Sequence, residues 1–419
     1  MKRLSRRQLL AAAGSAAATA ALAPYVHAWG HDKLKVGLIG CGGRGTGAAE
    51  DCLRSSPDVE LVAIADLFPD RLAGCRKNLT DPNRDGGPLA VKLDDDHCFT
   101  GFDAYQKLLA LDEIGLVLLA TPPGFRPIHF AAAIEAGKHV FFEKPVAVDA
   151  WGAKKVIQFG EIAAKRGLGV VAGTQRRHQN SYLETMKRIH DGAIGEIVSA
   201  RCGWNQGALW VHERKKNESD MEWQVRNWLY FCWLSGDHIV EQHVHNLDVC
   251  NWALKGHPVK AVGVGGRQVR TEPKYGHIFD HFTIDYEYAG GVHMTSMCRQ
   301  QNGTDGWVGE QIIGTTGASD PGGSISGSSS WRFKGENPNP YVVEHRDLIV
   351  SIRDGKPLNE AGQVAESTLT AIMGREAAYT GRIVSWDSLL KADASLAPKS
   401  YEFGPLEVPA VPVPGRKAR

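Results

Sequence analysis

The sequence predicts a two-domain fold, with a doubly wound parallel α/β domain followed by an α+β domain that contains an open, mostly antiparallel sheet. Three observations predict it. The chain has 419 residues, and a domain usually contains roughly 100–200 residues. Short apolar runs alternate with amphipathic segments over residues 35–173, which is typical of a parallel sheet with crossover helices. Polar and apolar residues alternate over residues 283–297 around a glycine turn, which is typical of an antiparallel hairpin.

The first domain is expected at residues 33–173. Its apolar runs predict strands at 35–40, 60–66, 116–120, 139–143 and 169–173. The amphipathic segments between them predict helices at 44–54, 103–110, 126–136 and 153–165. Strands that alternate with helices in this way indicate a sheet whose ligand-binding crevice lies at the carboxyl ends of the strands.

The second domain is expected at residues 174–395. Its clearest feature is the hairpin, with strands at 283–288 and 292–297 joined by Ala289-Gly290-Gly291. Residues 317–330 are rich in Gly and Ser and predict a loop or mobile segment. Residues 341–353 and 363–380 predict helices, and the Pro-rich tail at 396–419 is expected to be extended.

The composition is that of an ordinary soluble globular protein, with 43% hydrophobic and 23% charged residues. The formal net charge of +1 gives no reason to expect a nucleic-acid or membrane-surface partner. The eight cysteines form no C-x-x-C pair, which disfavours zinc ribbons and thioredoxin-like redox sites.

The first 28 residues predict an export signal. Ser5-Arg6-Arg7-Gln8-Leu9-Leu10 is a twin-arginine pattern, an Ala-rich apolar segment follows over residues 11–23, and Val26-His27-Ala28 resembles a cleavage site. The apolar segment is too short to span a membrane, so no membrane anchor is expected. A basic tail is the alternative interpretation. The signal predicts the Tat export machinery as a partner and a periplasmic or extracellular location.

A glycine motif follows the first predicted strand. In Gly40-Cys41-Gly42-Gly43-Arg44-Gly45, Gly40 permits a tight turn, Gly42 lets the backbone approach a pyrophosphate, and Gly45 allows close helix–strand packing. Arg44 belongs to the same loop. Asp66 ends the second strand, where a carboxylate accepts hydrogen bonds from the adenosine ribose and repels a 2′-phosphate. The motif therefore predicts a bound dinucleotide, with NAD favoured over NADP.

Further polar residues follow the third and fourth main strands. Thr121 and Pro122 come directly after the strand at 116–120, with His129 eight residues beyond Thr121, and Glu143-Lys144-Pro145 ends the strand at 139–143. These positions lie at the ligand-binding edge of the sheet. From the strand pattern alone, Lys144 is a proton donor, an anion clamp or a surface charge.

These residues together resemble the Gfo/Idh/MocA family, which includes glucose–fructose oxidoreductase and inositol dehydrogenase. The resemblance implies a two-domain NAD(P)-dependent enzyme that forms dimers or tetramers. It also implies that Lys144 lies beside the nicotinamide, and that Thr121, Pro122, His129 and Glu143 contribute to the cofactor site. The family pattern also contains Ala-Gly-Lys-His-Val before Glu-Lys-Pro, and this chain has Glu135-Ala136-Gly137-Lys138-His139-Val140 at that place.

A histidine-rich run supplies the second half of the predicted catalytic group. Glu241, His245 and Asp248 have the spacing at which the family carries Asp, His and Asp, and they share one face if the segment is helical. His245 is expected to be the general acid/base. The run also admits a metal site built from His238, Glu241, His243 and His245, although the H-E-x-x-H pattern is absent, or a helix that packs its histidines at the domain interface.

Two short segments are candidate substrate contacts. The first is Gln175-Arg176-Arg177-His178, where the chain leaves the nucleotide domain, and the resemblance favours Arg177 over Arg176. The second contains Arg226, Asn227 and Trp228, since indole faces stack on sugar rings and Arg and Asn donate to hydroxyls. Asp248 completes this predicted substrate set. Surface charge or interface packing is the alternative for both segments.

The predicted function is an exported NAD(P)-dependent oxidoreductase that transfers hydride between nicotinamide and a carbinol carbon of a sugar, polyol or sugar derivative. Because free NAD is scarce outside the cytoplasm, the cofactor is expected to be tightly bound. An NAD-dependent glycoside hydrolase, which oxidises a sugar carbon transiently and recycles the cofactor, is the main alternative. A cofactor-bound sensor or sugar-binding module is the third.

Overall fold

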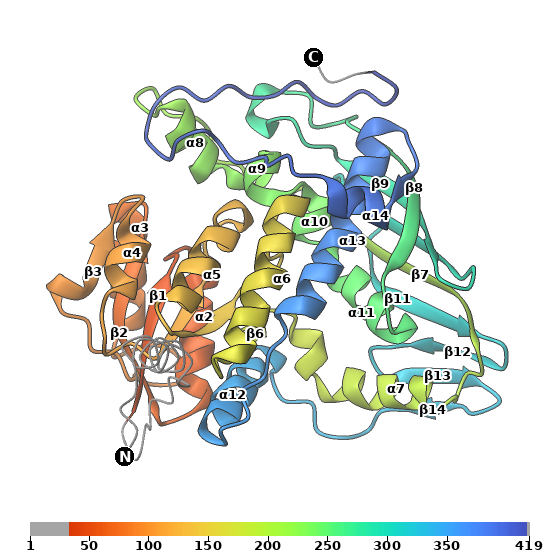
Figure 1. Cartoon of the computed structure of the whole chain (residues 1–419), viewed down its shortest axis with the longest axis horizontal. Helices are drawn as coiled ribbons and strands as arrows, with labels where there is room; N and C mark the ends of the chain where they lie inside the picture. Colours follow the sequence, from red (N-terminus) through yellow and green to blue (C-terminus); the bar gives the residue numbers. More distant parts are fainter. Residues whose placement is uncertain (1–32, 417–419) are drawn as a thin grey trace, which may run out of the picture.

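The computed structural model describes residues 33–416. The predicted export signal at residues 1–28 lies outside the described part. Two sheets with their helices stand side by side, the first near the N-terminal end and the second formed by the later part of the chain (Figure 1).

The first sheet has six parallel strands in the order β3-β2-β1-β4-β5-β6. They are β1 (Leu34–Ile39), β2 (Val59–Asp66), β3 (Cys98–Thr100), β4 (Leu116–Leu119), β5 (His139–Phe142) and β6 (Val170–Ala172). The predicted parallel sheet is confirmed. β3 was not predicted because it is three residues long and only partly buried, so it lacks an apolar run.

Helices cover both faces of this sheet. They are α2 (Gly43–Ser55), α3 (Pro69–Leu79), α4 (Ala104–Leu109), α5 (Arg126–Glu135) and α6 (Ala150–Lys165), with 3₁₀ turns η1 (Asp95–His97) and η2 (Pro123–Phe125). The four predicted helices are confirmed. α3 was missed because its three buried residues, Leu72, Cys75 and Leu79, are too few to produce a clear apolar stripe.

The second sheet has nine strands in the order β14-β13-β12-β11-β7-β10-β9-β8-β15. They are β7 (Ile197–Gln206), β8 (Pro258–Gly266), β9 (His281–Tyr288), β10 (His293–Gln300), β11 (Trp307–Gly314), β12 (Gly317–Asp320), β13 (Ser324–Gly327), β14 (Trp331–Arg332) and β15 (Val384–Ser385). β7 and β10 pair in parallel, and the other neighbours are antiparallel. The predicted β9–β10 hairpin is confirmed.

The prediction of a loop at residues 317–330 is wrong. This segment contains the β12–β13 hairpin, in which Gly317 pairs with Gly327 and Asp320 with Ser324. Small residues allow the close approach that builds it: a Cβ on Gly317 would lie 2.4 Å from the Ser326 carbonyl oxygen. Composition alone therefore suggested a loop where backbone pairing forms strands.

The second domain carries two groups of helices. The first comprises η3 (Gln175–His178), α7 (Asn180–His190), α8 (Asp220–Arg226), η4 (Trp228–Tyr230), α9 (Cys232–Ser235), α10 (His238–Glu241) and α11 (Val244–Leu254). The second comprises η5 (Pro273–Tyr275), α12 (Pro340–Arg353), α13 (Ala361–Thr380) and α14 (Trp386–Lys391). The two late helices predicted at 341–353 and 363–380 are confirmed. The histidine-rich run is two helices with a break at Gln242 and His243.

The late helices return to the first domain and fix the two sheets together. α12 packs against α2 and β6, and α13 lies between α6 and β8; Figure 1 shows both in blue beside the orange and yellow helices. At the sheet edge, Val170 N donates to the Leu358 carbonyl at 2.8 Å, and Glu360 N donates to the Val170 carbonyl at 2.9 Å. Contacts from the end of the chain thus hold the crevice between the domains at one geometry.

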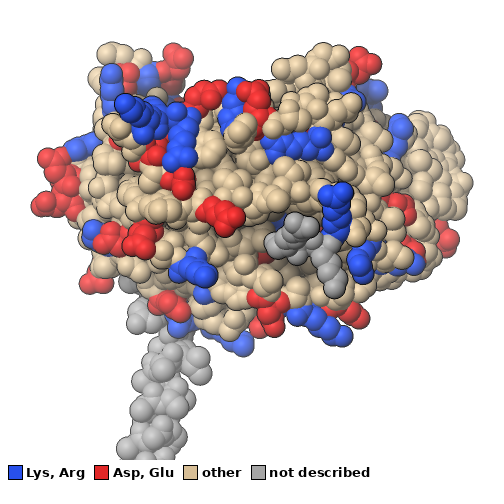
Figure 2. Space-filling model, turned by 90° about the horizontal axis from the view of Figure 1, so that it is seen from above, with Lys and Arg blue, Asp and Glu red and all other residues tan. Residues whose placement is uncertain are grey.

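The described surface shows no large patch of one charge on the face in Figure 2, where Lys and Arg side chains are mixed with Asp and Glu. Among the described residues, no helix is both long and apolar enough to cross a bilayer.

A buried histidine of η3 joins two of these returning segments. His178 Nδ1 lies 2.8 Å from Asp347 Oδ2 of α12, and His178 Nε2 lies 3.2 Å from Glu360 Oε1 before α13. Burial opposes a charge on this imidazole, but the two carboxylates outweigh it and raise the pKa of His178 to about 9. His178 is therefore a cation at neutral pH and holds η3 to both helices.

The contacts of His178 with Asp347 and Glu360 predict that the stability of the protein depends on pH. The folded-state pKa is above the unfolded value, so its contribution is fully present below about pH 6.5 and is lost as the pH rises through about 9. We expect His178→Gln to lower the free energy of unfolding at pH 6.5 by on the order of 3 kcal/mol. The variant and wild type should converge toward pH 10 in thermal unfolding scans. An equal difference at both pH values would contradict a charged His178.

Candidate active site

A cavity of about 770 Å³ opens where the first sheet faces the second domain. Its floor is formed by the carboxyl ends of β1, β2, β4 and β5, and its roof comes from α10, α11 and the segment that contains Trp210 to Trp228. Both domains therefore contribute side chains to one cavity, as is common for cofactor and substrate sites.

The structure brings most of the predicted site residues into this cavity. Those from the first domain are Gly40, Gly42, Arg44, Gly45, Asp66, Thr121, Pro122, His129, Glu143 and Lys144. Those from the second domain are Arg226, Trp228, Glu241 and His245.

The glycine loop is shaped to receive a phosphate group. Gly40 has φ +103°, and a Cβ there would lie 2.6 Å from the Ala120 carbonyl carbon. A Cβ on Gly45 would lie 1.8 Å from the Gly40 carbonyl oxygen, so only glycine lets α2 start so close to the turn. Gly42 and Gly43 have open space at the same position. The loop and the N-terminus of α2 therefore fit a dinucleotide pyrophosphate.

Asp66 lies beside this loop at the end of β2. Its carboxylate accepts hydrogen bonds from Cys41 N at 2.7 Å and Phe68 N at 2.8 Å. Burial raises the pKa of Asp66, although both backbone donors act in the opposite direction. Each carboxylate oxygen has one such bond and can accept another from a ribose hydroxyl.

Arg44 does not project freely into the cavity. Its Nε donates to Glu143 Oε1 at 2.7 Å, its Nη2 lies 3.0 Å from Asp51 Oδ2, and its guanidinium stands 5.1 Å from the ring of Tyr341. The arginine therefore ties the glycine loop to the strand end that carries Lys144.

Lys144 and Glu241 meet across the domain interface. Lys144 Nζ donates to Glu241 Oε1 at 2.9 Å and to the Glu241 backbone carbonyl at 2.6 Å. Both side chains are about 15% exposed, at 14% and 15%. The Lys144–Pro145 peptide bond is cis. A charge-assisted pair of this kind fixes the ammonium group in one place within the cavity.

His245 lies in the first turn of α11 and reaches the same cavity. Burial lowers the pKa of His245 well below its usual value, and the positive charges of Lys144 and Arg176 lower it further. The imidazole is therefore neutral at physiological pH and can accept a proton. Its ring is stacked with Trp204, with the centroids 5.8 Å apart.

His129 and Thr121 form a second polar contact on the cofactor side. Thr121 Oγ1 lies 3.2 Å from His129 Nδ1, and the imidazole packs between the rings of Tyr105 and Phe125. Burial, followed by the charge of Arg126, lowers the pKa of His129 to about 3. This neutral, packed imidazole positions the Thr-Pro turn and is not suited to carry a proton at neutral pH.

Three predicted substrate residues do not line the cavity. Arg177 is held by Asp248, with its Nε 2.8 Å from Oδ2 and its Nη2 2.9 Å from Oδ1, and Ser367 donates to the same carboxylate. Asn227 is fully buried, accepts from His212 N and donates to the Lys274 carbonyl. These side chains support the second domain from within, and Arg176 is the arginine that approaches His245.

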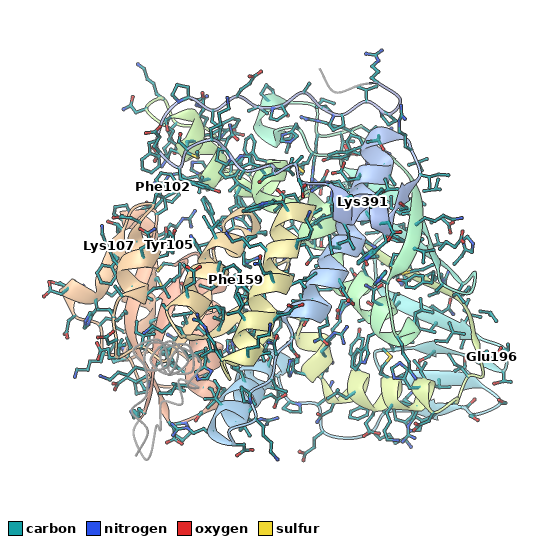
Figure 3. The ribbon with its side chains drawn as sticks, viewed as in Figure 1. Phe102, Tyr105, Lys107, Phe159, Glu196 and Lys391 are labelled. Carbon is teal, nitrogen blue, oxygen red and sulfur yellow. The ribbon has the colours of Figure 1, made fainter. Side chains whose placement is uncertain are left out.

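Several aromatic residues of the cavity were not predicted from the sequence. They are Phe68, Phe102, Tyr105, Trp210 and Tyr341. Each comes from a loop or the first turn of a helix, where no strand or helix periodicity marks the residues that face inward. Figure 3 shows Phe102 at the end of the first domain that faces α8 and the C-terminal tail.

The metal interpretation of the histidine-rich run finds no support in its geometry. His238 Nδ1 lies 2.9 Å from Asp237 Oδ1, and His243 Nε2 lies 2.7 Å from Ser296 Oγ, so the two histidines have separate partners. Within residues 33–416, no group of three or more His, Cys, Asp or Glu side chains is arranged to hold a metal ion.

A parallel sheet with a phosphate-shaped glycine loop, next to a lysine, a carboxylate and a neutral histidine, defines an NAD-binding oxidoreductase. The chain belongs to the GFO/IDH/MocA oxidoreductase family. Residues 34–173 match the "Oxidoreductase family, NAD-binding Rossmann fold" profile, and residues 182–319 match the "GFO/IDH/MocA C-terminal domain" profile.

Individual relatives agree with this assignment. The chain is 28% identical to inositol 2-dehydrogenase of Rubrobacter xylanophilus over 291 residues, which cover 68% of this chain and 70% of that protein. It is 38% identical to glycosyl hydrolase family 109 protein 1 of Bacteroides fragilis over 117 residues, 28% of this chain and 23% of that protein. The fold resembles that of GenD2 from gentamicin A biosynthesis in complex with NAD, with a TM-score of 0.65, 19% identity, and coverage of 84% and 96% of the two chains.

The geometry of Asp66 predicts cofactor selectivity. Replacing Asp66 with Ser should weaken NAD binding at least about tenfold, because hydrogen bonds to a charged acceptor are lost. It should also reduce the preference for NAD over NADP, because the carboxylate no longer repels a 2′-phosphate. Titration of both nucleotides by fluorescence measures the ratio of the two Kd values. Asp58→Ser, at an exposed position before β2, is the matched control, and an unchanged ratio in Asp66→Ser would contradict the ribose assignment.

Proposed function

We propose that the protein oxidises a carbinol carbon of a sugar, cyclic polyol or related derivative with NAD as hydride acceptor. The observation that carries this proposal is the convergence of Lys144, Glu241 and His245 in the cavity that begins at the glycine loop. A hydroxyl-bearing carbon between these groups and the cofactor site is the arrangement that alcohol oxidation needs.

The chain's own groups divide the proton chemistry. Neutral His245 accepts the proton of the reacting hydroxyl, because its lowered pKa keeps it unprotonated at working pH. The Lys144 ammonium, held by Glu241, stabilises negative charge on the oxygen as that proton leaves. Bound NAD supplies the hydride acceptor. In the reverse direction the same two residues return the proton to the carbonyl oxygen.

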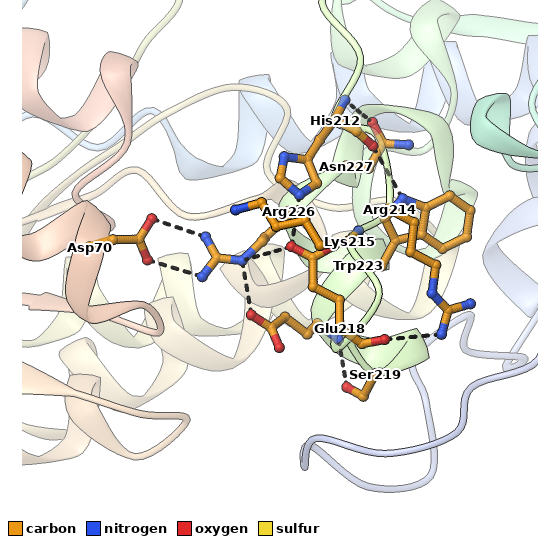
Figure 4. Close-up of polar contacts among 10 residues, drawn as sticks. Asp70, His212, Arg214, Lys215, Glu218, Ser219, Trp223, Arg226 and Asn227 are labelled. Carbon is orange, nitrogen blue, oxygen red and sulfur yellow. Dashed lines mark hydrogen bonds and ion pairs between the residues drawn. The ribbon is translucent and has the colours of Figure 1, made fainter.

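We further propose that the cofactor stays bound between turnovers, and that a second, carbonyl-bearing sugar takes the hydride from the bound NADH and restores NAD. Arg226 of α8 reaches over the cavity to Asp70 of α3, with Nη1 3.1 Å from Oδ2 and Nη2 3.0 Å from Oδ1 (Figure 4). Its guanidinium also stacks on Phe68, 3.8 Å from the ring centroid. This ion pair, here called the clasp, closes the second domain over the side of the cavity where Asp66 lies.

The C-terminal tail supports the clasp from outside. Gly404 accepts a hydrogen bond from Met221 N at 3.1 Å, and the ring of Phe403 lies 6.1 Å from Phe68 and 5.1 Å from Phe102. The tail runs across α8 in Figure 1. Release of NAD past this segment therefore requires separation of α8, the tail and the first domain together.

A second function merits a test because one relative is a glycosyl hydrolase family 109 protein and the clasp lies across the cofactor side of the cavity. In that case bound NAD is reduced and reoxidised within one cycle, and a glycosidic bond is broken without net redox change. Aryl glycosides incubated with the purified protein and no added NAD separate the two proposals. Aglycone release without accumulation of NADH favours the hydrolase, and NADH accumulation without release favours the dehydrogenase.

The proposal also covers the location of the protein and its oligomeric state. We propose Tat-dependent export to the periplasm or beyond, which suits a protein that loads its cofactor before transport, and assembly into dimers or tetramers. Export is tested by replacing Arg6 and Arg7 with Lys and following the location of the protein in cell fractions. Light scattering of the purified protein measures the oligomeric state.

The catalytic assignment predicts separate effects on chemistry and on cofactor binding. Lys144→Ala and His245→Ala should each reduce kcat by about 10²–10⁴-fold, as expected for loss of a positioned proton-transfer group. Bound NAD should remain in both variants, as measured by mass spectrometry after denaturation. Turnover near the wild-type rate with NAD still bound would exclude the assigned roles. For the wild type, kcat/KM for oxidation should not fall between pH 8 and pH 6.5, because the pKa of His245 lies well below 6.5.

The clasp predicts the rate of cofactor loss. Arg226→Gln and Asp70→Asn should each speed NAD dissociation by about threefold to tenfold, since a partly exposed bidentate pair contributes on the order of 1 kcal/mol. The control is Arg214→Gln, which removes an ion pair with Asp220 on the same segment. Asp70 does not line the cavity. An effect of Arg226→Gln without one of Asp70→Asn would therefore indicate direct contact with NAD and would argue against the clasp.

A further inference from the structure

A second cavity, of about 780 Å³, lies next to the candidate active site. It is bounded by β11 and the β12–β13 hairpin. β11 pairs with β7 from Trp307 to Gly314, whereas β12 pairs with β11 only at Ile312 and Ile313. The hairpin therefore diverges from residues 307–311, which have no strand on that side within the described chain, and a slot opens in the sheet.

The slot is lined by groups that form hydrogen bonds with hydroxyls. Its uncharged polar members are Gln175, Gln179, Gln311, Ser319, Ser324 and Ser326. Gln175 Nε2 donates to Tyr341 at 3.2 Å, but its buried Oε1 has no hydrogen-bond partner. Among the described contacts, the side chain of Gln179 makes no hydrogen bond. A buried acceptor without a partner is costly, and rotation of the Gln175 amide toward the slot would let a ligand hydroxyl bond to it.

The charged groups of the slot balance one another. Arg176 pairs with Glu310, whose carboxylate also accepts from Asn246 Nδ2 at 2.6 Å and Tyr182 at 3.2 Å. Burial raises the pKa of Glu310 to about 7, against the opposing charge of Arg176. Because the arginine is already neutralised, the inner wall does not select an anion.

Flat aromatic groups complete the lining. Arg201 stands over the Trp307 ring, 5.4 Å from its centroid, and Asp320 faces the slot near Tyr182, with Oδ1 accepting from Gly322 N at 2.9 Å. Uncharged hydrogen-bonding groups beside aromatic rings are suited to a ring with several hydroxyls, which presents both polar edges and apolar faces.

The slot adjoins the candidate active site at one shared residue. Tyr341 lines both cavities. Arg176 stacks 5.8 Å from the ring of Trp204, and Trp204 in turn stacks on His245. These contacts place the inner end of the slot one side chain away from His245.

We propose that the slot is a second carbohydrate subsite, so that the substrate is a disaccharide or a sugar-linked glycoside. One sugar is oxidised between Lys144 and His245, and the sugar joined to it lies between β11 and the β12–β13 hairpin. This inference rests on the proposed function, and it adds that recognition of the second ring comes from Gln175, Gln179 and Asp320.

The test compares disaccharides with their monosaccharides on the NAD-loaded, full-length protein. Maltose, cellobiose and lactose are each compared with glucose and galactose, and kcat/KM is measured from the single-turnover reduction of the bound NAD. We expect at least a tenfold preference for one disaccharide. The double variant Gln179→Ala, Asp320→Asn should reduce that preference at least fivefold, and Asp305→Asn, a carboxylate on the exposed β10–β11 turn, should keep it. Equal kcat/KM for monosaccharides and disaccharides, or a preference that survives the double variant, overturns the subsite and leaves the oxidation intact.

A binding measurement separates the subsite from the proposed chemistry. Calorimetric titration of the same disaccharides into Lys144→Ala protein requires no turnover. Binding that the double variant weakens at least fivefold supports the subsite even if no sugar reduces NAD, an outcome that rejects the proposed oxidation alone. Binding that is the same with and without the slot substitutions rejects the subsite.

Discussion

The contact between Lys144 and Glu241 is the interaction on which the site depends. Lys144 is carried by the end of a strand in the first domain, and Glu241 by the end of a short helix in the second. Their hydrogen bonds at 2.6 and 2.9 Å hold only when the two domains sit at one distance. That distance is set elsewhere: α12 and α13 cross back to the first domain, and His178 fastens them to η3. The end of the chain thus determines the geometry at its middle.

The electrostatics of the cavity follow from the same arrangement. Lys144 is positively charged, and this charge disfavours protonation of the neighbouring His245 imidazole. Burial and that positive charge keep His245 neutral, so a ring nitrogen is free to accept a proton. In the proposed mechanism, two groups of different type beside one reacting oxygen take different roles, one stabilising charge and the other accepting a proton. Removing either group should change the behaviour of the other, so their substitutions are not expected to be additive.

Sequence alone was sufficient for the residues whose position follows from strand phase. Gly40, Asp66, Thr121 and Lys144 end four strands of one parallel sheet, and such ends meet at one edge. The same reasoning could not show which of two adjacent residues on a tight turn faces the site. Arg177 was preferred to Arg176, but on η3 the two side chains point in different directions, and Arg177 is held by Asp248 in the interior.

Long-range contacts were also beyond the reach of local patterns. Arg226 and Asp70 are 156 residues apart, and nothing near either residue indicates the other. The slot arises in a segment whose Gly and Ser composition predicted a loop. The clasp and the slot both lie between different helices or strands. What a residue faces there depends on the element that packs against it, and not on the periodicity of its own segment.

Glu241 shows how one departure from the family pattern is accommodated. The family carries Asp at this position, and Glu is longer by one methylene group. Glu241 is the last residue of α10, so its backbone carbonyl is not required inside that helix and accepts from Lys144. The longer side chain then curves back to place its carboxylate on the same ammonium group. Carbonyl and carboxylate of one residue bind one cation, so the end of α10 and its side chain orient the Lys144 ammonium group together.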